Sequence, residues 1–259
     1  MILGLALERQ TSMIEHVEKN ENQPNLNRPV SVWVIRHFTP APGYPEENPL
    51  TETAPEEAKR ASGEILSQVK DREILVIYGA DVKGRHQETR RLLESELEKQ
   101  IEENGRNIDL IKLPPTSYKR ESLRGPGFSK EYVGRAGGIQ KLLPYWMTGE
   151  DTFEGQVQRP EEVGRRLRSL IRGLTSCTRR SPSFGQKVHV VLITSNEVPT
   201  PEMAKKFGNK GLGLDPSRWV RFDVGPGEKF DRVRITRWDG ISAISDLSKS
   251  GDIAIKPSS

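Results

Sequence analysis

Four compact runs of Val, Ile and Leu do most to constrain the fold of this chain. They cover residues 30–35, 73–79, 108–113 and 188–194. Apolar runs of this length are typical of strands whose two faces are both covered, as in parallel sheets. Segments with helical periodicity separate the runs along the sequence. The alternation predicts an α/β domain of three layers, with helices on both faces of a mainly parallel central sheet.

Three helices are predicted between these strands. The first follows Thr53, which has the spacing of a capping box with Glu56, and the second spans residues 84–103. The third begins near Pro160, since proline is favoured in the first turn of a helix. Each helix has an apolar face for burial. In the first helix this face consists of Ala58, Ala61, Ile65 and Val69.

The third helix also has a basic face. It consists of Arg165, Arg166, Arg168 and Arg172. We interpret it as a solvated cationic face, because a nucleic-acid-binding helix normally comes with interleaved aromatic residues or a known binding module. The sequence therefore argues against a nucleic-acid partner.

Two further strands are predicted toward the C-terminus. Residues 219–224 and 232–238 alternate apolar and polar side chains, which is typical of edge strands. Residues 225–229, Gly-Pro-Gly-Glu-Lys, predict a hairpin turn between them,.

The 259 residues are enough for one large domain,. Residues 1–29 end in a stretch rich in Asn and Pro, which predicts a partly flexible N-terminal extension. Residues 30–259 form the predicted domain, with a cap or insert at about 114–160 that shapes the site. Within it, residues 124–149 supply aromatic side chains.

The composition constrains the cellular location and the binding partners that we expect. The net charge of +4 and the pI of about 9.1 favour anionic partners,. No stretch reaches the roughly 18 to 20 apolar residues of a membrane helix, so we expect no membrane association. The single cysteine, Cys177, excludes an internal disulfide. We therefore expect a cytoplasmic location.

The residues that could carry chemistry follow the predicted strands. Arg36 and His37 come directly after the first strand, and Arg85 opens the helix after the second. The carboxyl ends of parallel strands share one edge of a sheet, where ligands bind. Two guanidinium groups there suit a phosphate, and a neutral imidazole can accept a phosphoryl group. The simpler alternative is a hydrogen-bonded strand-end histidine beside a surface ion pair.

The order of several motifs resembles the histidine phosphatase superfamily, also called the phosphoglycerate mutase-like family. The resemblance covers residues 30–245 and includes Ile-Arg-His after the first strand and Leu-Thr-Glu at residues 50–52. The spacing from Arg85 to Thr89 also matches the Arg-x-x-x-Thr helix of that family. The resemblance implies a three-layer α/β/α fold and phosphate chemistry.

The resemblance also implies roles for individual residues. His37 would be the phosphoryl-accepting nucleophile, and Arg36 and Arg85 would bind the phosphate oxygens. Glu121 would be the proton donor for the leaving group. Its alternative role is that of a surface acid paired with Lys119 or Arg124. No metal and no other cofactor is expected.

Two departures from the family pattern matter. Phe38 replaces the glycine that normally follows the histidine, and its bulk would narrow the approach or redirect the loop. Ser195, followed by Asn196, stands where a second histidine is expected. These side chains can hydrogen-bond a phosphate but bring no positive charge, and losing one such donor costs about 10²–10³ in rate. His86 could substitute, or could be an ordinary helix-surface histidine.

These residues support one leading function and two alternatives. The leading hypothesis is a metal-independent phosphomonoester hydrolase that forms a phosphohistidine at His37. The first alternative is a catalytically impaired relative that binds a phosphorylated ligand or partner. A weaker one is a phosphoglycerate mutase-type phosphotransferase. In each case the partner is a phosphorylated small molecule or a phosphoprotein, while the oligomeric state is left open.

Overall fold

One seven-stranded sheet organises the described part of the protein. The computed structural model describes residues 27–41, 49–80, 84–113, 125–148, 155–181, 186–227 and 230–248. The strands are β1 (Val30–Arg36), β2 (Ile74–Ala80), β3 (Asp109–Lys112), β4 (Val188–Thr194), β5 (Trp219–Val224), β6 (Val233–Arg237) and β7 (Ser242–Ser245). The helices are α2 (Ala54–Leu66), α3 (Gly84–Glu103), α4 (Lys130–Ala136), α5 (Ile139–Met147), α6 (Pro160–Arg180) and α7 (Thr200–Phe207), with a 3₁₀ turn η2 (Gly208–Gly211).

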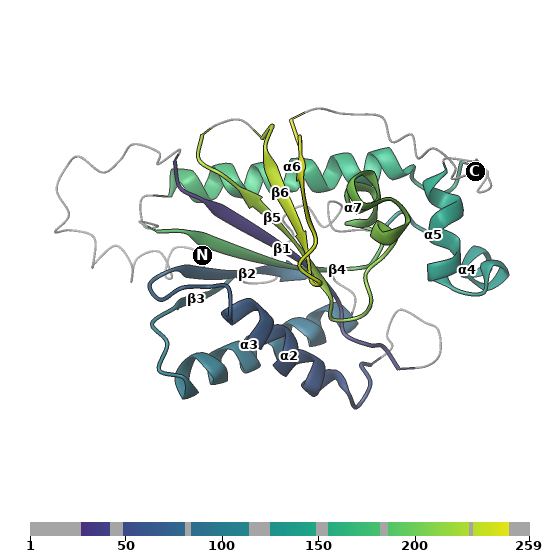
Figure 1. Cartoon of the computed structure of the whole chain (residues 1–259). Helices are drawn as coiled ribbons and strands as arrows, with labels where there is room; N and C mark the ends of the chain where they lie inside the picture. Colours follow the sequence, from purple (N-terminus) through teal and green to yellow (C-terminus); the bar gives the residue numbers. More distant parts are fainter. Residues whose placement is uncertain are drawn as a thin grey trace, which may run out of the picture.

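The strand order is β3-β2-β4-β1-β5-β6-β7. Strands β3, β2, β4 and β1 pair in parallel, whereas β5, β6 and β7 follow as antiparallel neighbours. Figure 1 shows α2 and α3 on one face of the sheet and α6 on the other. The predicted α/β class is thus confirmed. Because β4 is inserted between β1 and β2, the chain reverses its winding there, which is where such sheets bind ligands.

The prediction of edge strands at residues 219–224 and 232–238 is wrong. Both β5 and β6 lie inside the sheet, whose outermost strands among the described residues are β3 and β7. The alternation of apolar and polar side chains indicates that one face of these strands is buried under apolar neighbours while the other is more open,. It does not indicate whether further strands pair beside them in the sheet.

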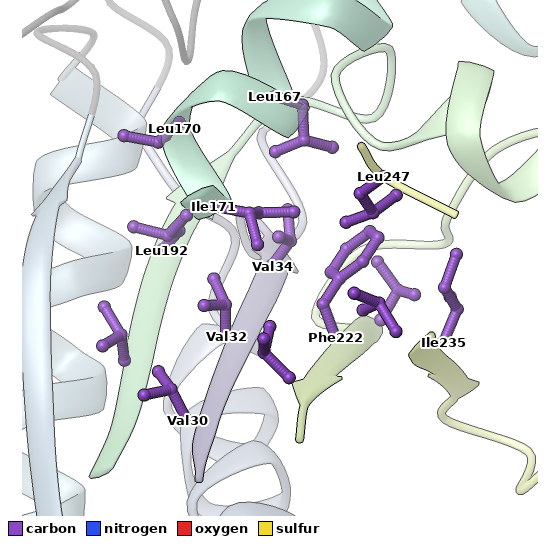
Figure 2. Packing of buried hydrophobic residues seen from close by; sticks show 14 of the residues in the cluster. Val30, Val32, Val34, Leu167, Leu170, Ile171, Leu192, Phe222, Ile235 and Leu247 are labelled. Atoms are coloured by element: carbon purple, nitrogen blue, oxygen red, sulfur yellow. The ribbon is translucent and has the colours of Figure 1, made fainter. Parts of the chain in front are cut away.

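Strand β1 is buried on both faces, which explains its unbroken apolar sequence. Its even-numbered Val side chains pack under α6, as Figure 2 shows with Leu167 and Ile171. Its odd-numbered side chains, Trp33 and Ile35, pack under α2 and α3. Burial of a large aliphatic side chain contributes about 1.5–3 kcal/mol, so two helical layers on one strand hold its position firmly.

The predicted helix boundaries are largely correct, but the predicted capping box at α2 is wrong. Thr53 precedes the helix with φ −80° and ψ −10°, which is already helical, and its side chain caps no backbone N–H. A capping side chain needs an extended backbone at that position. Instead, Thr53 Oγ1 lies 3.4 Å from the carboxylate of Glu57. The predicted apolar face of α2 is buried as expected.

The interpretation of the α6 arginines as one solvated face needs correction. Arg165 is exposed, but Arg168 forms an ion pair with Glu202 of α7, and the two side chains are only 4% and 2% exposed. Gly164 permits this contact, because a Cβ there would lie 2.7 Å from a Glu202 carboxylate oxygen. The pair therefore ties α6 to α7, which follows the loop after β4.

No helix in the described ranges is both long and apolar enough to cross a membrane.

We expect Arg168→Ala to lower the free energy of unfolding by about 3 kcal/mol, because it leaves the buried Glu202 carboxylate with only its 3.6 Å contact to Lys205 Nζ,. Urea denaturation measures this change. The matched control is Arg165→Ala, on the same helix but exposed, which should stay within about 0.5 kcal/mol of the wild type. Equal effects of the two substitutions would contradict a structural role for the buried pair.

Candidate active site

The backbone of His37 is held between two neighbouring segments at the carboxyl end of β1. Its N–H donates to the carbonyl oxygen of Thr194 at 3.0 Å, which extends the β1–β4 pairing by one residue. Its carbonyl oxygen accepts a hydrogen bond from the N–H of Ser217 at 3.4 Å. His37 therefore starts from a fixed backbone, and its side chain is only 4% exposed.

The contact between His37 and the Phe38 carbonyl shows which ring nitrogen of His37 carries the proton. Nδ1 lies 2.8 Å from the carbonyl oxygen of Phe38. A carbonyl oxygen can only accept, so Nδ1 carries the proton in the neutral ring. The lone pair then lies on Nε2, the nitrogen that would act as a nucleophile.

Burial keeps the imidazole of His37 neutral. It lowers the pKa of His37 to about 2, with further lowering by His86, Arg85 and Arg36, while the hydrogen bond to the Phe38 carbonyl acts in the opposite direction. A charged ring would have to give up hydration among groups that are themselves cationic. At neutral pH the ring is therefore in its nucleophilic form.

Phe38 does not narrow the approach to His37. Its side chain is fully buried in the core beneath α2 and α3, and its N–H donates to Thr89 Oγ1 at 3.0 Å. The Arg-x-x-x-Thr spacing thus has a structural basis, because Thr89 anchors the loop one helical turn beyond Arg85. The large side chain serves packing where the family pattern has glycine.

Arg36 and Arg85 both lie within electrostatic reach of His37. The charge of Arg85 lowers the pKa of both His37 and Arg36, which places it close to both. Arg36 donates from Nη1 to the carbonyl oxygen of Leu214. The Nε atoms of both arginines are buried without a hydrogen-bond partner among the described residues. Such donors are suited to an anion.

Ser195 and Asn196 reach the site from the end of β4. The Asn196 side-chain oxygen accepts from the N–H of Leu214, and its amide nitrogen Nδ2 is buried with no partner in the described ranges. Gly213, at φ +86°, permits the close approach of its backbone to Asn196, because a Cβ there would lie 3.0 Å from that nitrogen. Asn196 thus offers one more donor beside the two arginines.

His86 lies inside the site, contrary to the interpretation as a helix-surface histidine. It is fully buried, and its ring centroid lies 5.0 Å from that of His37. Its Nε2 atom is 3.4 Å from Ser195 Oγ. The sequence offered a signal in the adjacent Arg85, since both side chains follow the strand that ends at the same edge. The site therefore holds two histidines, one of them from α3.

Glu197 is a member of the site that sequence reasoning missed. Burial lowers the pKa of Arg36, and the charge of Glu197 opposes that lowering more than any other group. Its Oε2 atom is buried without a hydrogen-bond partner among the described residues. It lies two residues beyond Ser195, so its position after β4 was the available signal. The predicted proton donor Glu121 lies outside the described residues.

Solved structures match this architecture. A mycobacterial glucosyl-3-phosphoglycerate phosphatase has a TM-score of 0.50 at 14% sequence identity, over 83% of this chain and 100% of the other. An alpha-ribazole phosphatase from Shigella flexneri has a TM-score of 0.42 at 13% identity, over 85% and 96% of the two chains. No protein-family model and no curated protein matches the sequence.

This chain has the phosphoglycerate mutase-like fold. The fold predicted from the order of the sequence motifs is thereby confirmed. In this chain His37 and Ser195 lie directly beyond the ends of the paired strands β1 and β4. Within the described ranges, no group of three or more His, Cys, Asp or Glu side chains could hold a metal ion.

The lowered pKa of His37 makes stability depend on pH. The folded-state pKa of His37 lies below the ordinary 6.5, so protons bind this residue more readily in the unfolded chain. Its contribution to the free energy of unfolding is therefore fully present above pH 6.5 and is lost as the pH falls below that value. We expect the unfolding free energy of the wild type to fall more steeply between about pH 6.5 and 5 than that of His37→Gln, by up to about 1.4 kcal/mol per pH unit. Urea unfolding at several pH values measures both slopes, and parallel profiles would contradict a buried neutral His37.

Proposed function

We propose that the protein hydrolyses phosphomonoesters through a phosphohistidine on Nε2 of His37, without a metal. The observation that carries this proposal is the geometry around His37: a buried ring whose Nδ1 is bonded to a carbonyl oxygen, leaving Nε2 available beside two arginines. The phosphoglycerate mutase-like fold supports the proposal, since it places these groups at the ligand-binding edge of the sheet.

The first step would be attack by Nε2 of His37 on phosphorus. The unpaired Nε donors of Arg36 and Arg85, with the amide of Asn196, would hold the phosphate oxygens and offset their charge in the transition state,. The N–P bond forms as the ester P–O bond breaks, and the leaving alkoxide takes a proton from a nearby acid.

The second step would be attack by water on the phosphohistidine. The carboxylate left by the first step takes a proton from the water, the N–P bond breaks as the new P–O bond forms, inorganic phosphate leaves, and the His37 ring regains its lone pair on Nε2. The hydrogen bond from Nδ1 to the Phe38 carbonyl persists throughout and holds the ring in place. The ring thus returns to its starting tautomer without a proton shuttle through the core.

His86 would take the part that the sequence pattern assigns to the residue at position 195. It lies next to the His37 ring, and an imidazole N–H can donate to a phosphate oxygen. Ser195 contacts His86 and would orient it. A histidine supplied by α3 would thus compensate for the serine after β4.

Glu197 is our proposed proton donor, with Glu121 as the alternative. The Glu197 Oε2 atom is buried and lacks a hydrogen-bond partner among the described residues, so this oxygen is available to exchange a proton with a leaving group,. The influence of its charge on Arg36 supports a position near the proposed phosphate site. The chemistry needs one acid here, so only one of the two residues should affect it strongly.

The substrate would be a phosphorylated small molecule, as in the glucosyl-3-phosphoglycerate phosphatase whose structure matches, or a phosphoprotein. A second function is favoured by Ser195, which lacks the charge of a histidine: an impaired relative that binds a phosphorylated ligand and releases it unchanged.

Hydrolysis of an aryl phosphate in EDTA tests the proposal. We expect turnover by the wild type, none by His37→Ala, and roughly 10²–10³-fold less by His86→Asn, because a phosphate donor is lost. A matched control is His189→Asn, a buried histidine at the far end of β4 that should leave kcat unchanged.

Three results would overturn the proposal. Turnover that stops in EDTA would point to a metal, and full turnover by His37→Ala would exclude the phosphohistidine. If the wild type binds phosphate without turning over, and Arg85→Ala does not bind it, the ligand-binding alternative is correct.

The identity of the proton donor is tested by the leaving group. Glu197→Gln should lower kcat about 10²-fold or more for an alkyl phosphate, whose leaving oxygen needs a proton. The same substitution should have little effect on a nitrophenyl phosphate, whose leaving group departs as an anion. Glu121→Gln is the matched comparison, and the reverse pattern would assign the role to Glu121.

A further inference from the structure

A cavity lies at the opposite end of the sheet from His37. It has a volume of about 440 Å³ and is lined by the first residues of β1, the approaches to β4 and β6, and the last residues of β5. Figure 1 shows that these segments meet at one end of the strands. Ser31, in its wall, is six residues from His37 along β1, or about 20 Å. The two sites are therefore separate.

The strand register brings the polar walls of this cavity onto one face. Ser31 pairs with Asp223, Asp223 with Arg234, and Arg234 with Ile244. Residues directly opposite each other across neighbouring strands project to the same side. Arg234 and Ile244 remain exposed, so no described helix covers this end of β6 and β7. The cavity is therefore open to solvent on this face of the sheet.

The one acid in the wall of the cavity is already satisfied. Asp223 accepts a hydrogen bond from Ser31 Oγ at 2.6 Å and an ion pair from Arg221 Nε at 2.9 Å. Arg221 is itself held in place, because it also donates to Gln68 and lies 5.0 Å above the ring of Trp33. These contacts leave Asp223 little capacity to neutralise further cations.

Three more cations line the same cavity without a counterion. Lys187, Arg232 and Arg234 all lie in its wall, and none forms an ion pair with an acid within the described ranges. Like charges held together this way raise the local positive potential and attract anions. By contrast, the buried Arg168 forms an ion pair with Glu202. Among the described residues, the cavity thus concentrates positive charge that has no ion-pair partner.

We propose that this cavity binds a small metabolite that carries two or more phosphate groups. Guanidinium forks match phosphate oxygens, and the volume is that of a metabolite-sized pocket,. Ile244 offers an apolar surface for the organic part. A concave pocket with three such cations favours a compact ligand over nucleic acid, which is bound along an extended basic stripe.

Isothermal titration with inorganic tripolyphosphate and with ATP, in EDTA, tests this site. Titration of Arg85→Ala, in which the His37 site has lost a phosphate ligand, should still show binding. Adding Arg234→Ala should weaken that binding by roughly ten- to a hundredfold, as expected for loss of a charged hydrogen bond. ATP binding tighter than tripolyphosphate would support the contact with Ile244.

The matched control is Arg165→Ala, which removes the same charge from the exposed face of α6 and should leave affinity unchanged. Thermal melting verifies that each variant is folded. Equal weakening by Arg165→Ala and Arg234→Ala would mean unspecific attraction and overturn the proposal. Binding that vanishes with Arg85→Ala alone would assign the anion to the His37 site. A marked preference for single-stranded or duplex DNA over both probes would replace the metabolite with nucleic acid.

Discussion

The parallel pairing of β1 with β4 is the constraint on which the rest of the site depends. The two strands are paired without interruption from Val30 opposite Val188 to Arg36 opposite Thr194. Parallel strands in this register end together, so the residues that follow them meet at one edge. A shift of one residue would turn every side chain to the other face. Burial of β1 under two helical layers makes that shift costly.

The site concentrates polar groups that lack partners in the described part of the chain. Arg36 and Arg85 each keep a buried Nε without an acceptor, and Asn196 and Glu197 each keep one buried polar atom unpaired. Buried polar groups are normally satisfied, since each unmet hydrogen bond costs about 1–3 kcal/mol. A bound phosphate would accept from the three donors, while the carboxyl of Glu197 would be left free to protonate an ester oxygen. The same arrangement fits both binding and hydrolysis.

Much of the fold followed from local patterns, and the errors have local explanations. Apolar runs and helical periodicity predicted β1, β4, α3 and α6 because each is a strong, regular pattern. The interior position of β5 and β6 could not be predicted from the sequence. Alternation of apolar and polar side chains indicates only which face of a strand is buried, and β7, which pairs beyond β6, is a short strand with little apolar character. The capping box failed because Thr53 has a helical backbone. Arg168 looked like a surface residue because its acidic partner is 34 residues away in sequence.

The sequence by itself predicted that Arg36, His37 and Arg85 would meet at one end of a parallel sheet, because Arg36 and His37 lie at the end of β1 and Arg85 lies in the first turn of the helix after β2. Only the tertiary structure decided how the site is completed. His86 and Glu197 enter it through the path of the chain after β2 and β4, which no periodicity encodes. The neutral state of His37 depends likewise on burial by segments distant in sequence. Protonation and positioning are properties of the assembled surroundings, since they depend on solvent exclusion and on nearby charges.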